Sequence, residues 1–364
     1  MDNKPACLKF AVVGHQDSWD NVMEFIKTMR LQADDNLSIE KVQEIFTYIP
    51  PRKIFDIAVN TGNASVMQGV YIETFIPPDE LDLKYLRKNI DKVKKACLLC
   101  ASLNIPVVSL GGFSSIVLEA GGQSFCKISN TYFTTGNTLT AAFITKGVEK
   151  ACALWSQPLS KSRLLIIGST GDIGSACVLY FEDKVAELLL CARQAGPLQK
   201  QSQQLNAKGI ANTASTSLKE HIDKADIIIS VASSIIDEEN LKGLSADTII
   251  CDAGYPKNLQ NKFLQNHERF FYGGMGIVTK GFEFENNLEQ VFYKFPLRNI
   301  GHGCLLEAVV LALENNNRSF SNGKGNITLK AMKDIIAMAY KHGITAAPLF
   351  NKVLIDERAA EKIS

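Results

Sequence analysis

A strand, a glycine turn and a helix follow one another near the middle of the chain, and no other feature constrains the fold as strongly. The apolar residues 164–167 have strand composition and lead into the turn Gly168-Ser169-Thr170-Gly171-Asp172-Ile173-Gly174. In such a turn the first glycine allows a tight bend, the second lets the backbone approach a pyrophosphate, and the third lets the helix pack on the sheet. The N-terminus of the helix then faces the anion. The pattern predicts a parallel α/β sheet that binds a dinucleotide.

The end of the next predicted strand indicates which dinucleotide is bound. This strand covers residues 187–193 and ends on Arg193, where an NAD enzyme carries a carboxylate for the ribose hydroxyl. A basic residue at that place favours the extra phosphate of NADP. The expected NADPH-binding residues are Gly168, Ser169, Thr170, Gly171, Asp172, Ile173, Gly174, Arg193, Ala232 and Gly254. The alternative is a glycine turn in an ordinary α/β domain, with Arg193 as a solvated surface charge.

Composition narrows the class of protein further. With 364 residues and 46% apolar content, the chain is long enough for two domains. Its net charge of +1 gives no reason to expect a nucleic-acid partner. Nine cysteines at irregular spacings indicate free thiols of a reducing compartment, and the histidines show no metal-ligand spacing. We therefore expect a cytoplasmic protein without a metal or a transmembrane segment, which leaves peripheral membrane contact open.

Strand-like and helix-like segments alternate along the chain and predict an α/β fold. We expect an N-terminal α/β domain over residues 1–157, which carries the substrate. Residues 158–280 show the alternation of a doubly wound parallel sheet, and we interpret them as a Rossmann-type NADP-binding domain. Residues 281–364 are expected to be mainly helical and to pack back onto the rest. Predicted helices cover residues 19–29, 79–102, 139–155, 305–313 and 328–342.

One cysteine lies in a context that would activate its thiol. Cys304 follows Gly301, His302 and Gly303 and begins an apolar helix, whose positive end would favour the thiolate. We interpret it as a candidate nucleophile, with His302 as a local cation or base and Glu307 bonded to the start of the helix. The two glycines would leave room for a substrate carbonyl. The alternative is that Cys304 is a small buried apolar residue.

Two residue pairs imitate functional motifs, and we assign a catalytic role to neither. Cys97 and Cys100 have the spacing of a redox or metal pair, but both fall on the apolar side of a predicted helix, which favours core packing. Tyr180 and Lys184 have the spacing of the catalytic pair of short-chain dehydrogenases. They lie in the helix directly after the glycine turn, which is the wrong place for that pair.

Seven sequence blocks, taken in order and spacing, are more specific than the glycine turn alone. They are Gly14-His15, Tyr71-Ile72-Glu73, residues 110–115 (LGGFSS), residues 133–138 (FTTGNT), residues 168–175, residues 254–259 (GYPKNL) and Asn326-Ile327-Thr328. Over most of its length the chain resembles the long-chain acyl-(acyl-carrier-protein) reductases, best known from cyanobacteria. That family has a nucleophilic cysteine with a glutamate three residues later, at a fixed distance before the Asn-Ile-Thr block. Cys304 and Glu307 match this arrangement without a gap.

The resemblance implies an activity and a set of partners. The family takes a fatty acyl group from acyl carrier protein or coenzyme A and reduces it with NADPH to an aldehyde, which an aldehyde-consuming enzyme could receive. In the expected mechanism the Cys304 thiolate attacks the thioester, and hydride then reaches the enzyme-bound acyl carbon. We hypothesise that the hydroxyls of Ser114 and Ser115, or nearby backbone amides, stabilise the oxyanion.

Some segments depart from the family, and two other functions stay open. Residues 20–66 and 295–303 do not look like the cyanobacterial sequences, and Leu139 stands where the family has a histidine. Acyl chain length, acyl donor and oligomeric state are therefore undecided. One rival is a two-domain dehydrogenase of the shikimate type, which passes hydride without a covalent intermediate and needs no Cys304. The other is a non-catalytic NADPH-binding sensor.

Overall fold

The computed structural model of the chain describes residues 8–29, 38–60, 66–120, 126–233, 236–254, 267–288, 294–323 and 325–355. Residue contacts divide the chain into two compact units. The first unit consists of Met1–Gly136, Val278–Gly323 and Met338–Ile344, and the second consists of Asn137–Ile277, Lys324–Ala337 and Thr345–Ser364. The boundary after Gly136 differs from the expected one at residue 157, because helix α5 (Asn137–Leu154) packs on the sheet of the second unit.

A mixed seven-stranded sheet forms the centre of the first unit, with the order β14-β2-β3-β1-β4-β6-β5. Its strands are β1 (Phe10–Gly14), β2 (Arg52–Asn60), β3 (Val66–Glu73), β4 (Val107–Leu110), β5 (Lys127–Ile128), β6 (Thr131–Thr134) and β14 (Phe282–Phe284). The four central strands β3, β1, β4 and β6 run parallel, and the remaining three pair antiparallel. The carboxyl ends of the parallel strands meet at one edge, where α/β proteins usually form their sites.

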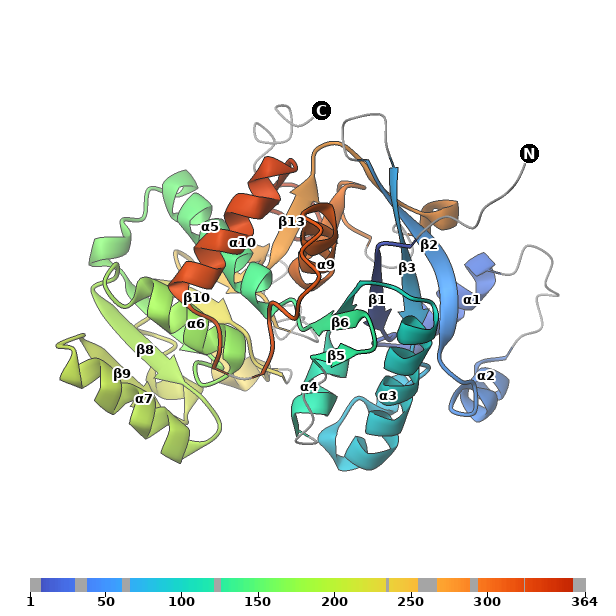
Figure 1. Ribbon diagram of the computed structural model, residues 1–364. Coiled ribbons are helices and arrows are strands. Elements are labelled where there is room, and N and C mark those ends of the chain that lie inside the picture. Colours follow the sequence, from blue (N-terminus) through green and yellow to red (C-terminus); the bar gives the residue numbers. More distant parts are fainter. Residues whose placement is uncertain are drawn as a thin grey trace, which may run out of the picture. The chain divides into compact units, whose positions relative to one another are not determined.

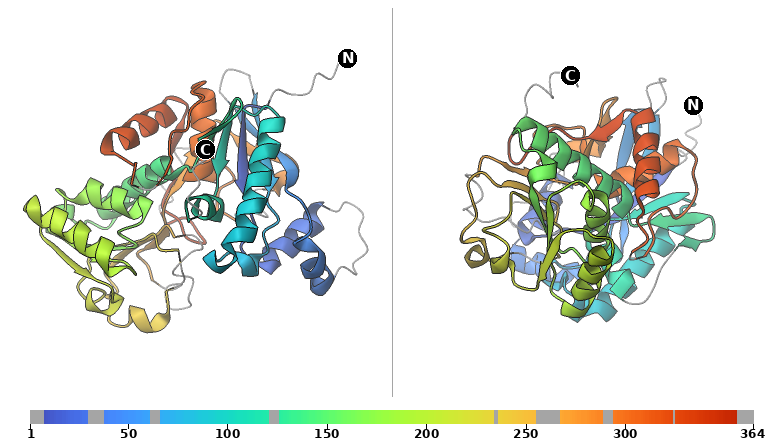
Figure 2. Two further views of the ribbon diagram at one scale, coloured as in Figure 1. Left: turned by 60° about the horizontal axis from the view of Figure 1, so that its bottom comes forward. Right: turned by 90° about the vertical axis from the view of Figure 1, so that its left-hand side faces the viewer.

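Helices cover both faces of this sheet. They are α1 (Trp19–Met29), α2 (Ile39–Phe46), α3 (Leu86–Ser102), α4 (Phe113–Ala120) and α9 (Gly303–Leu313). On one face α3 and α4 pack with the strands into a single apolar cluster, which includes Cys97 and Cys100 (Figures 1 and 2). The expected core role of these two cysteines is confirmed. Helix α9 packs against β4 and β1, and it is apolar nearly all round, as a fully buried helix must be.

The predicted helix over residues 79–102 begins later than expected. Two short 3₁₀ turns, Pro78–Glu80 and Leu83–Tyr85, precede α3, which starts at Leu86. The side chain of Asp82 accepts the backbone N–H of Lys84 and so caps the second turn. This cap competes with a continuous α-helix, which explains the difference.

The second unit has an all-parallel six-stranded sheet, in the order β12-β11-β10-β7-β8-β9. Its strands are β7 (Arg163–Ile167), β8 (Glu187–Cys191), β9 (Asn212–Ser215), β10 (Ile227–Ser230), β11 (Ile249–Asp252) and β12 (Phe270–Tyr272). This is the doubly wound Rossmann order, whose direction reverses between β7 and β10. Helices α5, α6 (Asp172–Phe181) and α7 (Ala195–Ala207) pack on one face (Figure 1). The predicted α/β class with a Rossmann-type sheet is confirmed.

The part of the chain after residue 280 is less helical than expected. It contains α9 and α10 (Leu329–Lys341), but it also provides β14, β15 (Ile300–His302) and β16 (Ile344–Ala346). A small sheet has the order β15-β13-β16, with β13 covering Met275–Val278. Within the described residues, no helix combines the length and apolarity that a membrane crossing requires.

Candidate active site

The glycine turn of the second unit has the geometry of a pyrophosphate cradle. Gly168 follows β7 with a φ of +88°, and a Cβ atom at this position would lie 3.0 Å from the backbone of Val231. Gly171 caps α6, and its N–H donates to the Gly168 carbonyl at 2.9 Å. A Cβ on Gly174 would overlap the same carbonyl oxygen. Close backbone packing thus requires glycine at positions 168 and 174, and the cradle fits a dinucleotide.

The remaining cofactor candidates lie at strand ends around this turn. Ala232 follows β10 and its backbone N is 3.1 Å from the position of a Cβ on Gly168, while the amide of Gly254 donates to Asp252 at 3.1 Å after β11. Arg193, after β8, donates through Nη2 to the Ser233 hydroxyl at 3.2 Å. The strands β8 and β10 are the two neighbours of β7 in the sheet. The Arg193 side chain therefore reaches from the end of β8, past the end of β7, to the loop after β10.

Two turn residues use their side chains within the protein itself. Asp172 accepts hydrogen bonds from Asn137 Nδ2 at 2.8 Å and from the amide of Gly325 at 2.9 Å, so its carboxylate is occupied. Ile173 packs into the apolar clusters of α5 and α6. These two residues are left with their backbone amides for a cofactor. The Ser169 hydroxyl, in contrast, is fully buried and, within the described parts of the chain, has no hydrogen-bond partner.

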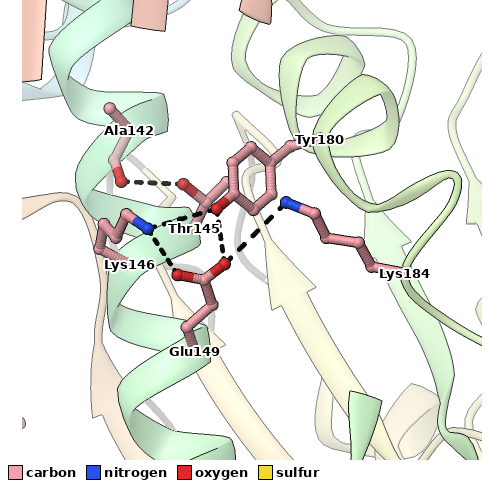
Figure 3. A network of polar contacts seen from close by, with 6 residues as sticks. All are labelled: Ala142, Thr145, Lys146, Glu149, Tyr180 and Lys184. Carbon is pink, nitrogen blue, oxygen red and sulfur yellow. Dashed lines mark hydrogen bonds and ion pairs between the residues drawn. The ribbon is translucent and has the colours of Figure 1, made fainter. Parts of the chain in front are cut away.

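The Tyr180–Lys184 pair belongs to a polar cluster between α5 and α6, which Figure 3 shows from close by. Tyr180 donates to Glu149 Oε1 at 2.5 Å, and Lys146 donates to Glu149 Oε2 at 2.7 Å. The ammonium of Lys184 lies 3.2 Å from the centre of the Tyr180 ring. The phenol is thus committed to a carboxylate on the neighbouring helix, which favours a structural role.

Cys304 is the second residue of α9 and lies at the carboxyl edge of the first unit's sheet. As a residue, Cys304 is partly exposed. Burial of the thiol raises its pKa to about 11, and this effect outweighs the backbone amides of Gly112, Leu305 and Cys304 itself, which lower it. The amides at the helix start act in the expected direction, since they lower the pKa of the thiol, but burial is the larger effect and favours the protonated form at neutral pH.

Gly136 forms one wall of the Cys304 site. Its φ is +72°, and a Cβ atom added to it would overlap the Cα of Cys304. The hydroxyl of Ser109 on β4 donates to the Cys304 carbonyl at 2.7 Å. Backbone segments after β4 and β6 thus hold the nucleophile candidate from two sides.

The first turn of α4 contains both serine candidates, and their hydroxyls differ in their hydrogen bonds. Ser115 donates to the Gly112 carbonyl at 3.1 Å and so closes the turn. The hydroxyl of Ser114 is fully buried and has no hydrogen-bond partner in the described part of the structure. His15 Nε2 accepts the N–H of Phe113 at 3.0 Å, and burial lowers the pKa of His15 to about 4. A neutral imidazole therefore holds the start of α4.

Glu307 has partners from outside α9, which the expectation from its spacing did not include. Its carboxylate is fully buried and accepts hydrogen bonds from the hydroxyls of Thr134 and Ser321, the latter at 2.9 Å. His302 is the N-cap residue of α9 without a side-chain cap bond, and its ring lies 5.5 Å from that of Phe295. The structure brings Cys304, Ser114 and Ser115 into one region of the first unit, and His302 is held next to Cys304 by the chain.

Several residues of this region were not predicted from the sequence. Gly136, Thr134, Ser321 and Ser109 contact Cys304 or Glu307 from distant parts of the chain. Thr134 and Gly136 belong to the FTTGNT block, which this chain shares with the reductase family it resembles. That shared block was the only sequence signal that could have indicated a role for them. Within the described residues, no group of histidine, cysteine and carboxylate side chains could hold a metal ion.

Comparison with known proteins defines the class. The model of the family described as shikimate / quinate 5-dehydrogenase matches residues 151–273, the part that contains the glycine turn. Together with the doubly wound sheet, this match makes the chain an NAD(P)-dependent oxidoreductase. More particularly, it is 29% identical over 348 residues to a long-chain acyl-[acyl-carrier-protein] reductase from Synechococcus elongatus, which covers 92% of this chain and 97% of that one. The resemblance to that family is confirmed.

Solved structures show weaker likenesses. L-tryptophan dehydrogenase from Nostoc punctiforme is 11% identical and has a TM-score of 0.41, with 98% of this chain and 87% of that chain covered. The dipicolinate synthase A chain from Bacillus subtilis is 16% identical with a TM-score of 0.35, and 85% and 96% of the two chains are covered. At these TM-scores neither likeness carries an argument about function.

Proposed function

We propose that the chain is an NADPH-dependent reductase of fatty acyl thioesters, which forms a fatty aldehyde through an acyl-enzyme on Cys304. Acyl carrier protein or coenzyme A is the acyl donor, and an aldehyde-consuming enzyme is the natural recipient of the product. The observation that carries the proposal is the likeness to a named acyl-[acyl-carrier-protein] reductase over nearly the whole of both chains. The position of Cys304 supports it, since it is a partly exposed residue in the first turn of α9, and the amides around it favour the thiolate.

The protonated resting thiol is consistent with the proton balance of this reaction. In the first step the Cys304 sulfur bonds to the acyl carbon, the carbon–sulfur bond of the donor thioester breaks, and the Cys304 proton goes to the departing thiolate. NADPH, when bound, supplies the hydride that reduces the acyl carbon. The carbon–sulfur bond to Cys304 then breaks, aldehyde leaves, and one proton from solvent restores the thiol.

Both steps pass through a tetrahedral oxyanion that needs hydrogen-bond donors. The buried hydroxyl of Ser114, which has no partner among the described residues, is better placed for this than Ser115, which is bonded to Gly112. The amide groups at the start of α4 are further donors.

We expect Ser114→Ala to lower kcat by about 100- to 1,000-fold, the usual effect of losing one oxyanion donor. Ser115→Ala is the matched control and should change kcat by less than about tenfold, because its hydroxyl closes a turn. Steady-state kinetics with a long-chain acyl thioester compares the two. Equal losses in both variants would remove the assignment of Ser114.

Arg193 is the residue that we expect to select NADPH over NADH. Its guanidinium lies at the end of β8, where the 2′-phosphate of NADP would be held. Arg193→Ala should raise the Kd of NADPH roughly 10- to 100-fold, as the loss of a charge-assisted hydrogen bond predicts. The Kd of NADH, which lacks this phosphate, should not change. Calorimetric titration measures both, and a parallel loss for both cofactors would contradict the role.

The runner-up is a shikimate-type dehydrogenase, which the family match over residues 151–273 favours. The deciding experiment incubates the purified chain with NADPH and a long-chain acyl-CoA or acyl-carrier-protein thioester, and separately with NADP⁺ and a small polyhydroxylated cyclohexene acid. NADPH oxidation with a stoichiometric fatty aldehyde supports the reductase. Turnover with the cyclic acid alone supports the runner-up, and cofactor binding without turnover supports the sensor.

A further inference from the structure

A buried carboxylate next to the nucleophile has no place in the steps described above. Glu307 lies three residues after Cys304 on α9, so the two side chains share one face of the helix, one turn apart. The Glu307 side chain is completely buried. Burial of a carboxylate is costly and is tolerated when both oxygens are hydrogen-bonded, so its position calls for an explanation.

The partners of Glu307 tie it to the wall of the Cys304 site. One carboxylate oxygen accepts the hydroxyl of Thr134 and the other accepts the hydroxyl of Ser321 at 2.9 Å. The amide of Ser321 donates back to the Thr134 oxygen at 3.0 Å, and the amide of Thr135 donates to the Ser321 carbonyl at 3.0 Å. Groups that donate to both oxygens are the partners of an ionised carboxylate, which can only accept.

This network ends at the nucleophile. Gly136 follows Thr135 directly, and its backbone lies so close to Cys304 that no Cβ atom fits between them. The carboxylate therefore fixes the segment that borders Cys304. We propose that Glu307 is a positioning residue, which holds the segment Thr134-Thr135-Gly136 against Cys304 and sets a negative charge one helical turn from the sulfur.

The negative charge of Glu307 also affects the pKa of the Cys304 thiol, which its positioning role alone would not. Glu307 adds to the effect of burial in raising the pKa of the Cys304 thiol, while the amides of Gly112 and Leu305 oppose it. Among the elements packed against α9, β15 ends on His302, His15 follows β1, and β1 and β4 carry no titratable group. Because burial lowers the pKa of His15 to about 4, that ring is neutral at pH 7. Glu307 thus adds to burial in favouring the thiol form of the resting cysteine, which resists oxidation and alkylation.

The test uses a probe that needs no acyl substrate. Iodoacetamide alkylation of the full chain is followed against pH, with the Cys304 peptide identified by mass spectrometry. Glu307→Gln keeps the shape and removes the charge, and we expect the midpoint of Cys304 alkylation to move down by about one pH unit. Ser321→Ala is the matched control: it removes one hydrogen bond and leaves the charge, so its midpoint must stay or rise.

This inference rests on the proposed function, because it takes Cys304 as the nucleophile. The alkylation test can nevertheless fail or succeed independently of the test for acyl transfer. An unchanged midpoint in Glu307→Gln, or an equal downward shift in Ser321→Ala, would overturn the role of Glu307 even if acylation is observed. A downward shift in Glu307→Gln alone supports it even if no acyl group is ever transferred. Circular dichroism of the three proteins shows that a shift comes from folded chains.

Discussion

Gly136→Ala should reduce acylation of Cys304 and turnover by about 100-fold or more. A Cβ atom at this position would overlap the Cα of Cys304, and neither backbone can yield without moving the start of α9. A displacement of about 1 Å at a reacting group is enough for a loss of this size. The unfolding free energy should also fall, by the ~1–2 kcal/mol of a left-handed alanine together with the ~1–3 kcal/mol of overpacking.

Gly209→Ala separates these two costs. Gly209 has nearly the same backbone conformation, with a φ of +74° against +72° for Gly136, but a Cβ atom there meets nothing within 4 Å. The control should therefore lose only the conformational part of the stability and keep its turnover. Urea unfolding and steady-state kinetics measure both quantities. A Gly136→Ala protein as active as Gly209→Ala would contradict the close approach to Cys304.

Cys304→Ala should abolish reduction of the acyl thioester and leave NADPH binding unchanged. The loss is complete in the proposed mechanism because no acyl-enzyme forms without the sulfur. Cys126→Ala is the matched control, since Cys126 and Cys304 are the partly exposed cysteines among those the structure describes. Full activity of Cys304→Ala, measured as NADPH consumption and aldehyde release, would move the protein to the noncovalent dehydrogenase.

Local sequence signals were sufficient for the nucleotide half of the fold. The run of residues 164–167 and the three glycines predicted β7, the turn and α6, because each glycine answers a local backbone constraint. The strands β9 and β12 were not predicted. The first is a short polar edge strand and the second has only three residues, so neither shows the apolar run of a buried parallel strand.

The first unit depends on contacts that local patterns do not contain. Strand β14 pairs with β2, with Phe282 opposite Val59, although more than two hundred residues separate them. Glu307 accepts the hydroxyl of Thr134 although 173 residues separate them in the sequence, so spacing within α9 does not reveal this partner. The pKa of the Cys304 thiol likewise depends on burial, which local sequence does not show and which outweighs the amides at the helix start.

In the candidate site too, some residues could be predicted from local sequence and others depend on the fold. Cys304 was found from the glycines, histidine and helix start around it, and from its match to a family pattern. Ser114 and Ser115 could not be distinguished from the sequence, because only the fold determines which hydroxyl closes the first turn of α4. The roles of Arg193, Ala232 and Gly254 stay predictions that follow from their strand ends.

The most direct test of the account is the intact mass of the protein after mixing with a long-chain acyl thioester in the absence of NADPH. We predict an added acyl mass on the wild-type chain and on Cys126→Ala, none on Cys304→Ala, and loss of the adduct as aldehyde when NADPH is supplied. An acyl adduct that persists on Cys304→Ala, or a wild-type chain that reduces the thioester without ever carrying the adduct, would contradict the covalent mechanism.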